Sequence, residues 1–86
     1  MTPKEAVAAA KSHIEDTFAG ELDYPSRLEE IWFDEGTSEW CVTFTLWRRA
    51  PALNRMIPGP TELKVVRVRD VDGRATSIRN RDYSPV

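Results

Sequence analysis

The sequence contains few of the residues that build the commonest covalent and metal sites. Among its 86 residues there is one cysteine, Cys41, and one histidine, His13. A lone cysteine cannot form an internal disulfide, and a structural zinc site needs four soft ligands, more than this pair supplies. We therefore expect a protein with no metal and no cofactor, working in a reducing compartment, the cytoplasm.

Long hydrophobic runs are also missing. No uncharged apolar stretch approaches the roughly 20 residues of a membrane span, and no apolar segment with a cleavage site follows Met1. We expect no membrane partner and no secretory signal. With only four glycines and six prolines, the composition is typical of one globular domain, residues 1–86.

Neither sign of charge dominates the whole chain, since the formal net charge is −2. Residues 1–47, however, carry ten acidic and three basic side chains, whereas residues 48–86 carry nine basic and four acidic ones. Such asymmetry either marks a charged partner or supplies ion pairs between early and late strands, and we favour ion pairs because the halves are not separate domains. Nucleic acid is not expected as the main ligand.

A helix is predicted for residues 3–18. Thr2 and Glu5 form a capping-box pattern around Pro3, and Gly20 provides a stop after the helix. One apolar stripe at helical spacing runs through Val7, Ala10, Ile14 and Phe18.

Four strands are predicted, over residues 27–34, 40–47, 61–69 and 75–81. The second has the clearest period of two, which places Trp40, Val42, Phe44 and Leu46 on one side and Cys41, Thr43, Thr45 and Trp47 on the other. In the third strand the apolar parity slips between Val65 and Val66, which suggests a bulge or a two-sided strand.

Polar turns at 35–38 and 70–73 indicate two hairpins, joined by a longer proline-rich segment, residues 48–60. The predicted fold class is α+β: one N-terminal helix packed on a four-stranded antiparallel sheet, whose opposite face meets water.

A family resemblance rests on the Ala-rich helix, the Leu-Glu-Glu-Ile run (Leu28 to Ile31), the Trp-led strand (Trp40 to Leu46) and the closing hairpin from Leu63 to Ile78. Over most of its length the chain resembles small PepSY-type and related cystatin-like domains, including immunity proteins that neutralise bacterial toxins. The resemblance implies a non-catalytic domain that binds or inhibits another protein. The cystatin motif Gln-x-Val-x-Gly is absent, so inhibition of cysteine proteases is not expected.

Catalytic interpretations are not favoured. Cys41 and His13 would be separated by the sheet, leaving a half-exposed thiol and a histidine on the flank of the helix. Two carboxylate pairs, Glu29 with Glu30 and Asp34 with Glu35, are adjacent in sequence, and adjacent strand residues point to opposite faces. We predict a solvated acidic hairpin and no catalytic residues.

A fragment of a calcium loop is present but incomplete. Asp70, Asp72 and Gly73 match its start, yet Arg81 stands where the closing glutamate would be. We predict a hairpin turn.

Trp32 and Trp47 are predicted on the outward face of the sheet. Exposed tryptophan is disfavoured unless something covers it, and tryptophan and arginine dominate interface hot spots. Two alternatives stay open: the long loop or the tail with Tyr83 covers them, or a partner does.

The segment after Trp47 mixes basic and apolar residues, namely Arg48, Arg49, Arg55 and Met56. It is either a recognition loop held by the sheet or a connection without a partner. Together with the tryptophans it forms the predicted binding surface of a non-enzymatic protein-binding module, an inhibitor or immunity-type factor. The alternative is a homodimeric structural or regulatory domain. A third hypothesis, an enzyme with a cleft between sheet and loop, is supported only by Cys41 and His13.

Overall fold

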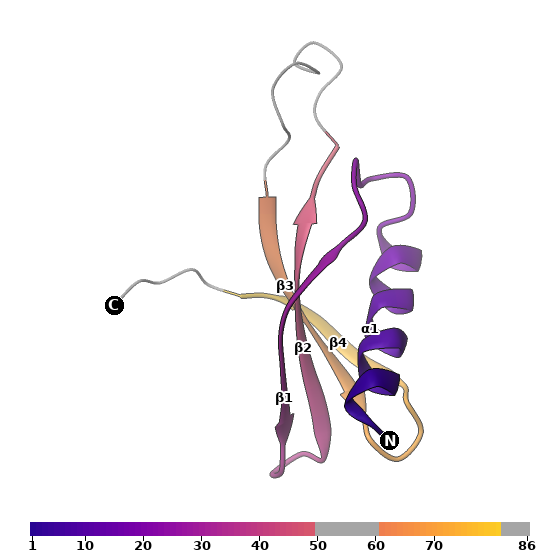
Figure 1. The fold of residues 1–86 in the computed structure, drawn as a ribbon, viewed down its shortest axis with the longest axis vertical. Helices are drawn as coiled ribbons and strands as arrows, with labels where there is room; N and C mark the ends of the chain where they lie inside the picture. Colours follow the sequence, from indigo (N-terminus) through magenta and orange to yellow (C-terminus); the bar gives the residue numbers. More distant parts are fainter. Residues whose placement is uncertain (50–60, 82–86) are drawn as a thin grey trace, which may run out of the picture.

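The computed structural model describes residues 1–49 and 61–81, which form one helix and four strands. Figure 1 shows the helix beside a sheet of strands. The elements are α1 (Pro3–Thr17), β1 (Arg27–Asp34), β2 (Glu39–Trp47), β3 (Thr61–Arg69) and β4 (Ala75–Asn80). The predicted α+β class is confirmed, with one-residue differences at the end of α1, the start of β2 and the end of β4.

The predicted capping box begins α1. The Thr2 hydroxyl accepts a hydrogen bond from the Glu5 backbone N–H at 3.2 Å, and the Glu5 carboxylate accepts one from the Thr2 N–H at 2.9 Å. These bonds satisfy N–H groups that the first turn leaves without helical partners. Within the described ranges, no helix has the length and apolarity needed to cross a membrane.

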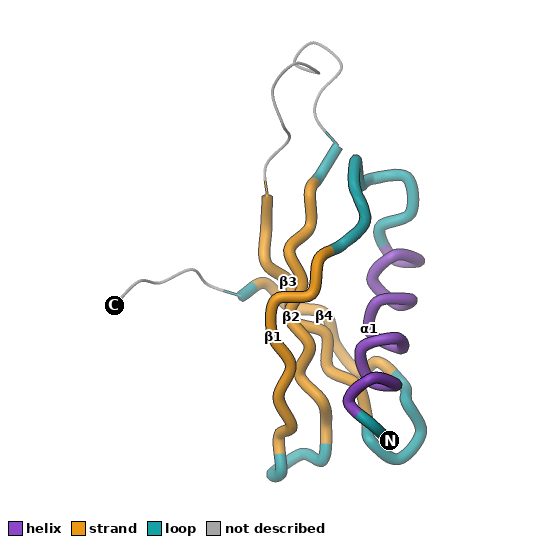
Figure 2. The backbone as a smooth tube through the Cα atoms, in the orientation of Figure 1, coloured by secondary structure: helices purple, strands orange, loops and turns teal. Residues whose placement is uncertain are grey.

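The sheet is an antiparallel meander in the order β1-β2-β3-β4. Figure 2 shows α1 lying on one side of it. The core between helix and sheet contains Ala10, Ile14, Val42, Phe44, Leu46, Val66 and Val68. The predicted inward side of β2 is therefore confirmed, with Trp40 packed partly buried against the same core.

The opposite side of β2 differs from the prediction. We expected this face to meet water, but Cys41, Thr43 and Thr45 are only 0%, 1% and 8% exposed. The reason is that β2 is an inner strand, so side chains from its neighbours on the same face close over its short residues. We call this side of the sheet, away from α1, the outer face.

Two register shifts shape the strands. One lies in β1 between Leu28 and Glu30, and the other lies where Arg67 and Val68 of β3 pair with β4. Along β2, β3 keeps a continuous register. The apparent slip in the apolar pattern of β3 therefore means that the strand is apolar on both sides, with Val66 buried in the core and Val65 on the outer face.

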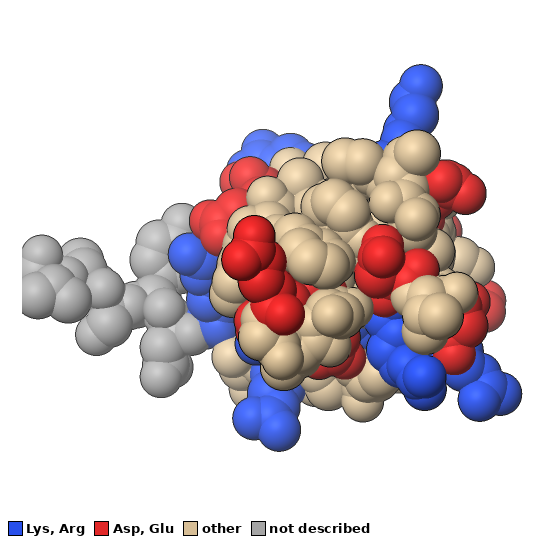
Figure 3. Space-filling view, turned by 90° about the horizontal axis from the view of Figure 1, so that it is seen from below, with Lys and Arg blue, Asp and Glu red and all other residues tan. Residues whose placement is uncertain are grey.

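Ion pairs join the acidic early part of the chain to the basic late part. Arg67 binds Asp34 and Glu39, and Arg81 binds Glu30. Figure 3 shows acidic and basic side chains interspersed at the end of the molecule that carries the hairpin turns. The uneven charge of the sequence thus supplies cross-strand pairs, as favoured above.

Candidate functional site

The outer face carries an open groove of about 380 Å³. All four strands contribute to it, because Trp32, Cys41, Arg67 and Ser77 lie opposite one another across the sheet. The full lining, which we call the outer groove, consists of Glu30, Trp32, Cys41, Thr43, Val65, Arg67, Ser77, Arg79, Asn80 and Arg81. It combines an aromatic ring, short floor residues and three guanidinium groups.

Trp32 lies at the β1 side of the outer groove. It remains 46% exposed, because β1 is an edge strand and nothing in the described chain packs over the ring from outside. A large, partly exposed tryptophan beside a groove is typical of an interface anchor. Its predicted outward orientation is confirmed.

Trp47 lies on the outer face as well, but far from Trp32. It stands six residues beyond Cys41, the β2 residue opposite Trp32, which corresponds to about 20 Å along the strand. The Tyr24 ring packs edge-on against Trp47 with centroids 6.2 Å apart, and the Arg27 guanidinium lies 5.4 Å from the ring centre. Among the described residues, the cover for Trp47 thus comes from the segment before β1 and from Arg27, which were not expected to cover it. Tyr83 and residues 50–60, which were expected to do so, lie outside the described residues.

The position of Tyr24 depends on backbone pairing at this end of the sheet. Leu22 pairs with Arg48 in an isolated antiparallel bridge, and the Asp23 N–H donates to the Trp47 carbonyl at 3.0 Å. The segment before β1 therefore runs beside the end of β2 and brings Tyr24 to Trp47.

Arg48 lies on the helix side of the sheet. Its guanidinium stacks 4.4 Å from the centre of the Phe18 ring and is bound to Glu62 and Glu21. In this position it covers the Phe18 ring, which packs partly buried against the core. Arg49 is exposed, and its backbone N–H donates to the Glu21 carbonyl at 2.7 Å. Arg55 and Met56, the other predicted binding residues, lie outside the described residues.

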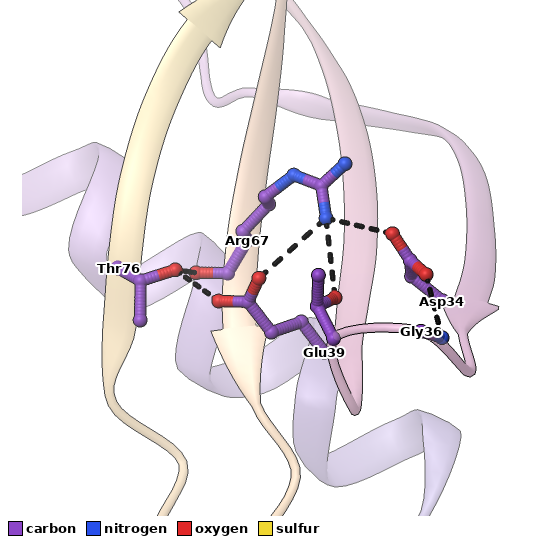
Figure 4. Close-up of polar contacts among 6 residues, drawn as sticks. Asp34, Gly36, Glu39, Arg67 and Thr76 are labelled. Atoms are coloured by element: carbon purple, nitrogen blue, oxygen red, sulfur yellow. Dashed lines mark hydrogen bonds and ion pairs between the residues drawn. The ribbon is translucent and has the colours of Figure 1, made fainter.

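Arg67 organises the end of the outer groove nearest the β1–β2 turn (Figure 4). Its guanidinium donates to Asp34 Oδ2 at 3.1 Å and lies 3.5 Å from Glu39 Oε1. The Thr76 hydroxyl donates to the other oxygen of Glu39. The hydrogen bond from Arg67 lowers the pKa of Asp34, and that from Thr76 lowers the pKa of Glu39. Asp34, Glu39 and Arg67 are therefore all charged at neutral pH.

The bulge in β1 corrects one expectation. Glu29 and Glu30 were predicted on opposite faces, but both bond to outer-face residues. Glu29 Oε1 accepts from the Thr45 hydroxyl at 2.8 Å, and Glu30 Oε2 accepts from the Arg81 guanidinium at 2.9 Å. A bulge sets two residues against one on the partner strand, which interrupts the strict alternation of sides. The hydrogen bond from Arg27 lowers the pKa of Glu29.

The cysteine prediction also needs correction. Cys41 was expected to be half exposed, yet its exposed fraction is 0%. Its neighbours across the sheet, Trp32 and Arg67, are large enough to cover it. Burial raises the pKa of the thiol, which makes it a poor nucleophile. His13 is exposed on α1, on the other side of the sheet, so the two groups do not meet.

Over residues 1–49 and 61–81, no three histidine, cysteine or acidic side chains gather as a set of metal ligands. The outer groove instead offers guanidinium and hydroxyl donors around an indole ring.

Comparisons with protein-family models, curated proteins and solved structures find no match to this chain. The resemblance to PepSY-type and cystatin-like domains therefore stays a prediction.

Sequence reasoning missed the basic side of the groove. Ser77 and Arg79 of β4, and Arg81 just beyond it, line the groove together with Arg67. Their spacing of two along the last predicted strand was the available signal, because alternate residues of a strand share a face.

Proposed function

We propose that this domain is a non-enzymatic protein-binding module whose binding surface is the outer face of the sheet. The observation that carries the proposal is the outer groove beside Trp32, which is 46% exposed on the face that α1 leaves open. Large exposed aromatic residues next to arginines are the usual anchors of protein interfaces. The buried Cys41 and its distance from His13 across the sheet give no support to an enzyme.

The proposed surface has a centre and a periphery. Trp32 and the arginines of the outer groove form the centre, whereas Trp47, already packed against Tyr24, contributes less. Arg49, which follows the end of β2, would extend the surface there, whereas Arg55 and Met56 lie outside the described residues. An inhibitor or immunity-type factor is the kind of binding module that the fold resemblance suggests, and the single cysteine favours the cytoplasm as its compartment.

Affinity capture with substituted domains tests this proposal. The tagged domain, its Trp32→Ala variant and a Val71→Ala control are used as bait in cell extract. Val71 is a suitable control because it is apolar and 82% exposed but lies in the β3–β4 turn. We expect to capture a protein that binds the parent domain and the control but not Trp32→Ala. Calorimetry with this protein, once purified, should give the same order of affinities. Capture that Trp32→Ala leaves unchanged would contradict the proposal.

The second candidate is a homodimer with no further ligand. The observation that favours it is the edge position of β1, which pairs with no strand but β2 among the described residues. Leu28, at 44% exposure, flanks this edge on one face and Trp32 on the other. An edge strand with apolar side chains can pair with its copy. Sedimentation velocity over a micromolar concentration range distinguishes the two candidates. A protein that stays monomeric at every concentration would exclude the homodimer.

A further inference from the structure

The arginines of the outer groove differ in whether the fold already uses their charge. Arg67 is bound to Asp34 and Glu39, and Arg81 is bound to Glu30. Arg79 lines the same groove and is exposed, and among the described residues it has no acidic partner. Within residues 1–49 and 61–81, Arg79 is therefore the guanidinium of the groove whose charge is available to a ligand.

A second unused donor lies beside Arg79. Ser77 is two residues away on the same face of β4, about 7 Å along the strand. Its Oγ is buried and makes no hydrogen bond to any described residue, although buried hydroxyls are nearly always bonded. Because Ser77 also lines the groove, rotation about its Cα–Cβ bond can turn the hydroxyl out of its buried, unbonded position and toward an anionic group that the Arg79 guanidinium binds.

The dimensions of the groove fit an extended chain. Trp32 and Ser77 are at opposite ends of one row across the four strands, separated by three strand spacings, about 14 Å. A peptide lying between them can place one side chain on the indole and another at Arg79.

We propose that the occupant of the outer groove is an acidic peptide segment of a partner protein. Its carboxylate accepts hydrogen bonds from Arg79 and Ser77, while a neighbouring apolar side chain packs on Trp32. This proposal rests on the proposed function and adds the chemistry of the partner to it.

Two other occupants fit less well. A nucleic acid would bring a row of phosphates to the face, but Arg67 and Arg81 are already bound to Asp34, Glu39 and Glu30, and the single guanidinium of Arg79 matches one carboxylate better than a row of phosphates. A second copy bound by two-fold symmetry would place the outer face of one copy against the outer face of the other. Each groove has more arginine than glutamate, so the two grooves would repel each other.

A random 12-residue peptide library displayed on phage provides the probe. The parent domain selects the peptides, and synthetic versions are then titrated against the parent, Arg79→Gln, Arg74→Gln and Trp32→Ala. Arg74 is a matched control because it is an exposed arginine in the turn before β4, outside the groove. Each selected peptide is also made with its aspartates and glutamates replaced by asparagine and glutamine.

We expect the selected peptides to contain acidic residues. Their affinity should fall about tenfold or more with Arg79→Gln, with the amide version of the peptide, and with Trp32→Ala, since a charge-assisted hydrogen bond is lost or a stacking surface removed. Arg74→Gln should leave the affinity within about twofold of the parent value.

The opposing results separate the two proposals. Peptides that depend on Trp32 but bind Arg79→Gln as tightly as the parent would overturn the acidic occupant and leave the docking face in place. Binding insensitive to Trp32→Ala would overturn both. Tighter binding of a single-stranded DNA 12-mer than of any peptide, or a dimer that Arg79→Gln dissociates, would replace the acidic peptide by nucleic acid or a second copy.

Discussion

At the scale of single residues, the outer groove contains side chains that hold the fold and side chains that are free to bind. Arg67 and Arg81 are tied to acidic partners on the neighbouring strands, whereas Arg79 lines the groove without one among the described residues. Trp32 keeps 46% of its surface exposed, while Phe44 of the core keeps none. Substitutions should therefore affect stability and binding to different degrees.

The contrast between Phe44 and Trp32 gives the first prediction. Phe44→Ala should lower the free energy of unfolding by about 3–5 kcal/mol, because it removes a fully buried ring and leaves a cavity. Trp32→Ala should lower it by less than about 1.5 kcal/mol, because the ring is only half covered. Urea denaturation followed by circular dichroism measures both values. Equal losses would mean that Trp32 belongs to the core and is not an interface residue.

The second prediction concerns the pH dependence of stability at Arg67. Because Arg67 lowers the pKa of Asp34 in the folded chain, the stabilisation is present above the ordinary carboxyl range and is lost as pH falls through the folded pKa. Arg67→Gln should therefore be less stable than the parent at pH 7. The difference should shrink below about pH 4.

Denaturation midpoints measured from pH 7 down to pH 2.5 test this dependence on Arg67. Arg74→Gln serves as the control, since it removes the same charge from an exposed position and should show no comparable trend. A gap between Arg67→Gln and the parent that stays constant with pH would contradict the ion pair.

At the scale of elements, the start of α1 depends on its cap. Thr2→Ala removes the hydroxyl that accepts from the Glu5 N–H and should cost about 1 kcal/mol, or about 4–8 °C in Tm for a domain of this size. Thr17→Ala, at the exposed end of the same helix, should not lower Tm. Thermal unfolding of both variants gives the comparison, and a similar loss at both ends would mean that capping is not the cause.

The faces of β2 could be predicted from sequence, because alternation with a period of two fixes the side to which each residue points. Trp40 and Phe44 point toward α1 and Cys41 points away, as expected. Depth of burial was not predictable in the same way. Cys41 is buried because Trp32 and Arg67 stand beside it on neighbouring strands, and that depends on strand order.

The bulge in β1 escaped prediction for a related reason. Leu28 and Ile31 are apolar and the two residues between them are glutamates, so the pattern fits more than one register. The observed register follows from long-range partners, since Glu29 bonds Thr45 and Glu30 bonds Arg81. Local periodicity contains no information about such partners.

At the scale of the whole molecule, the meander places acidic β1 and β2 beside basic β3 and β4. This order neutralises Asp34, Glu39 and Glu30 with late arginines and, among the described residues of the four strands, leaves Arg79 of β4 without an acidic partner. It also brings the segment before β1 to the end of β2, where Tyr24 packs on Trp47. The two outward tryptophans of the sequence thus differ in role, one covered by its own chain and one open beside the groove.

The three indole N–H signals provide the most direct measurement of the central claim, that the outer groove receives an acidic segment. In a two-dimensional ¹H–¹⁵N spectrum, Trp32 reports on the groove, Trp47 on the far end of the same face, and Trp40, which donates to Asp70 at 2.9 Å, on the helix side. Titration with a selected acidic peptide should shift the Trp32 indole and the Ser77 and Arg79 amides, and leave Trp40 and Trp47 in place. Shifts confined to Trp40, Trp47 or the amides of α1 would contradict the account.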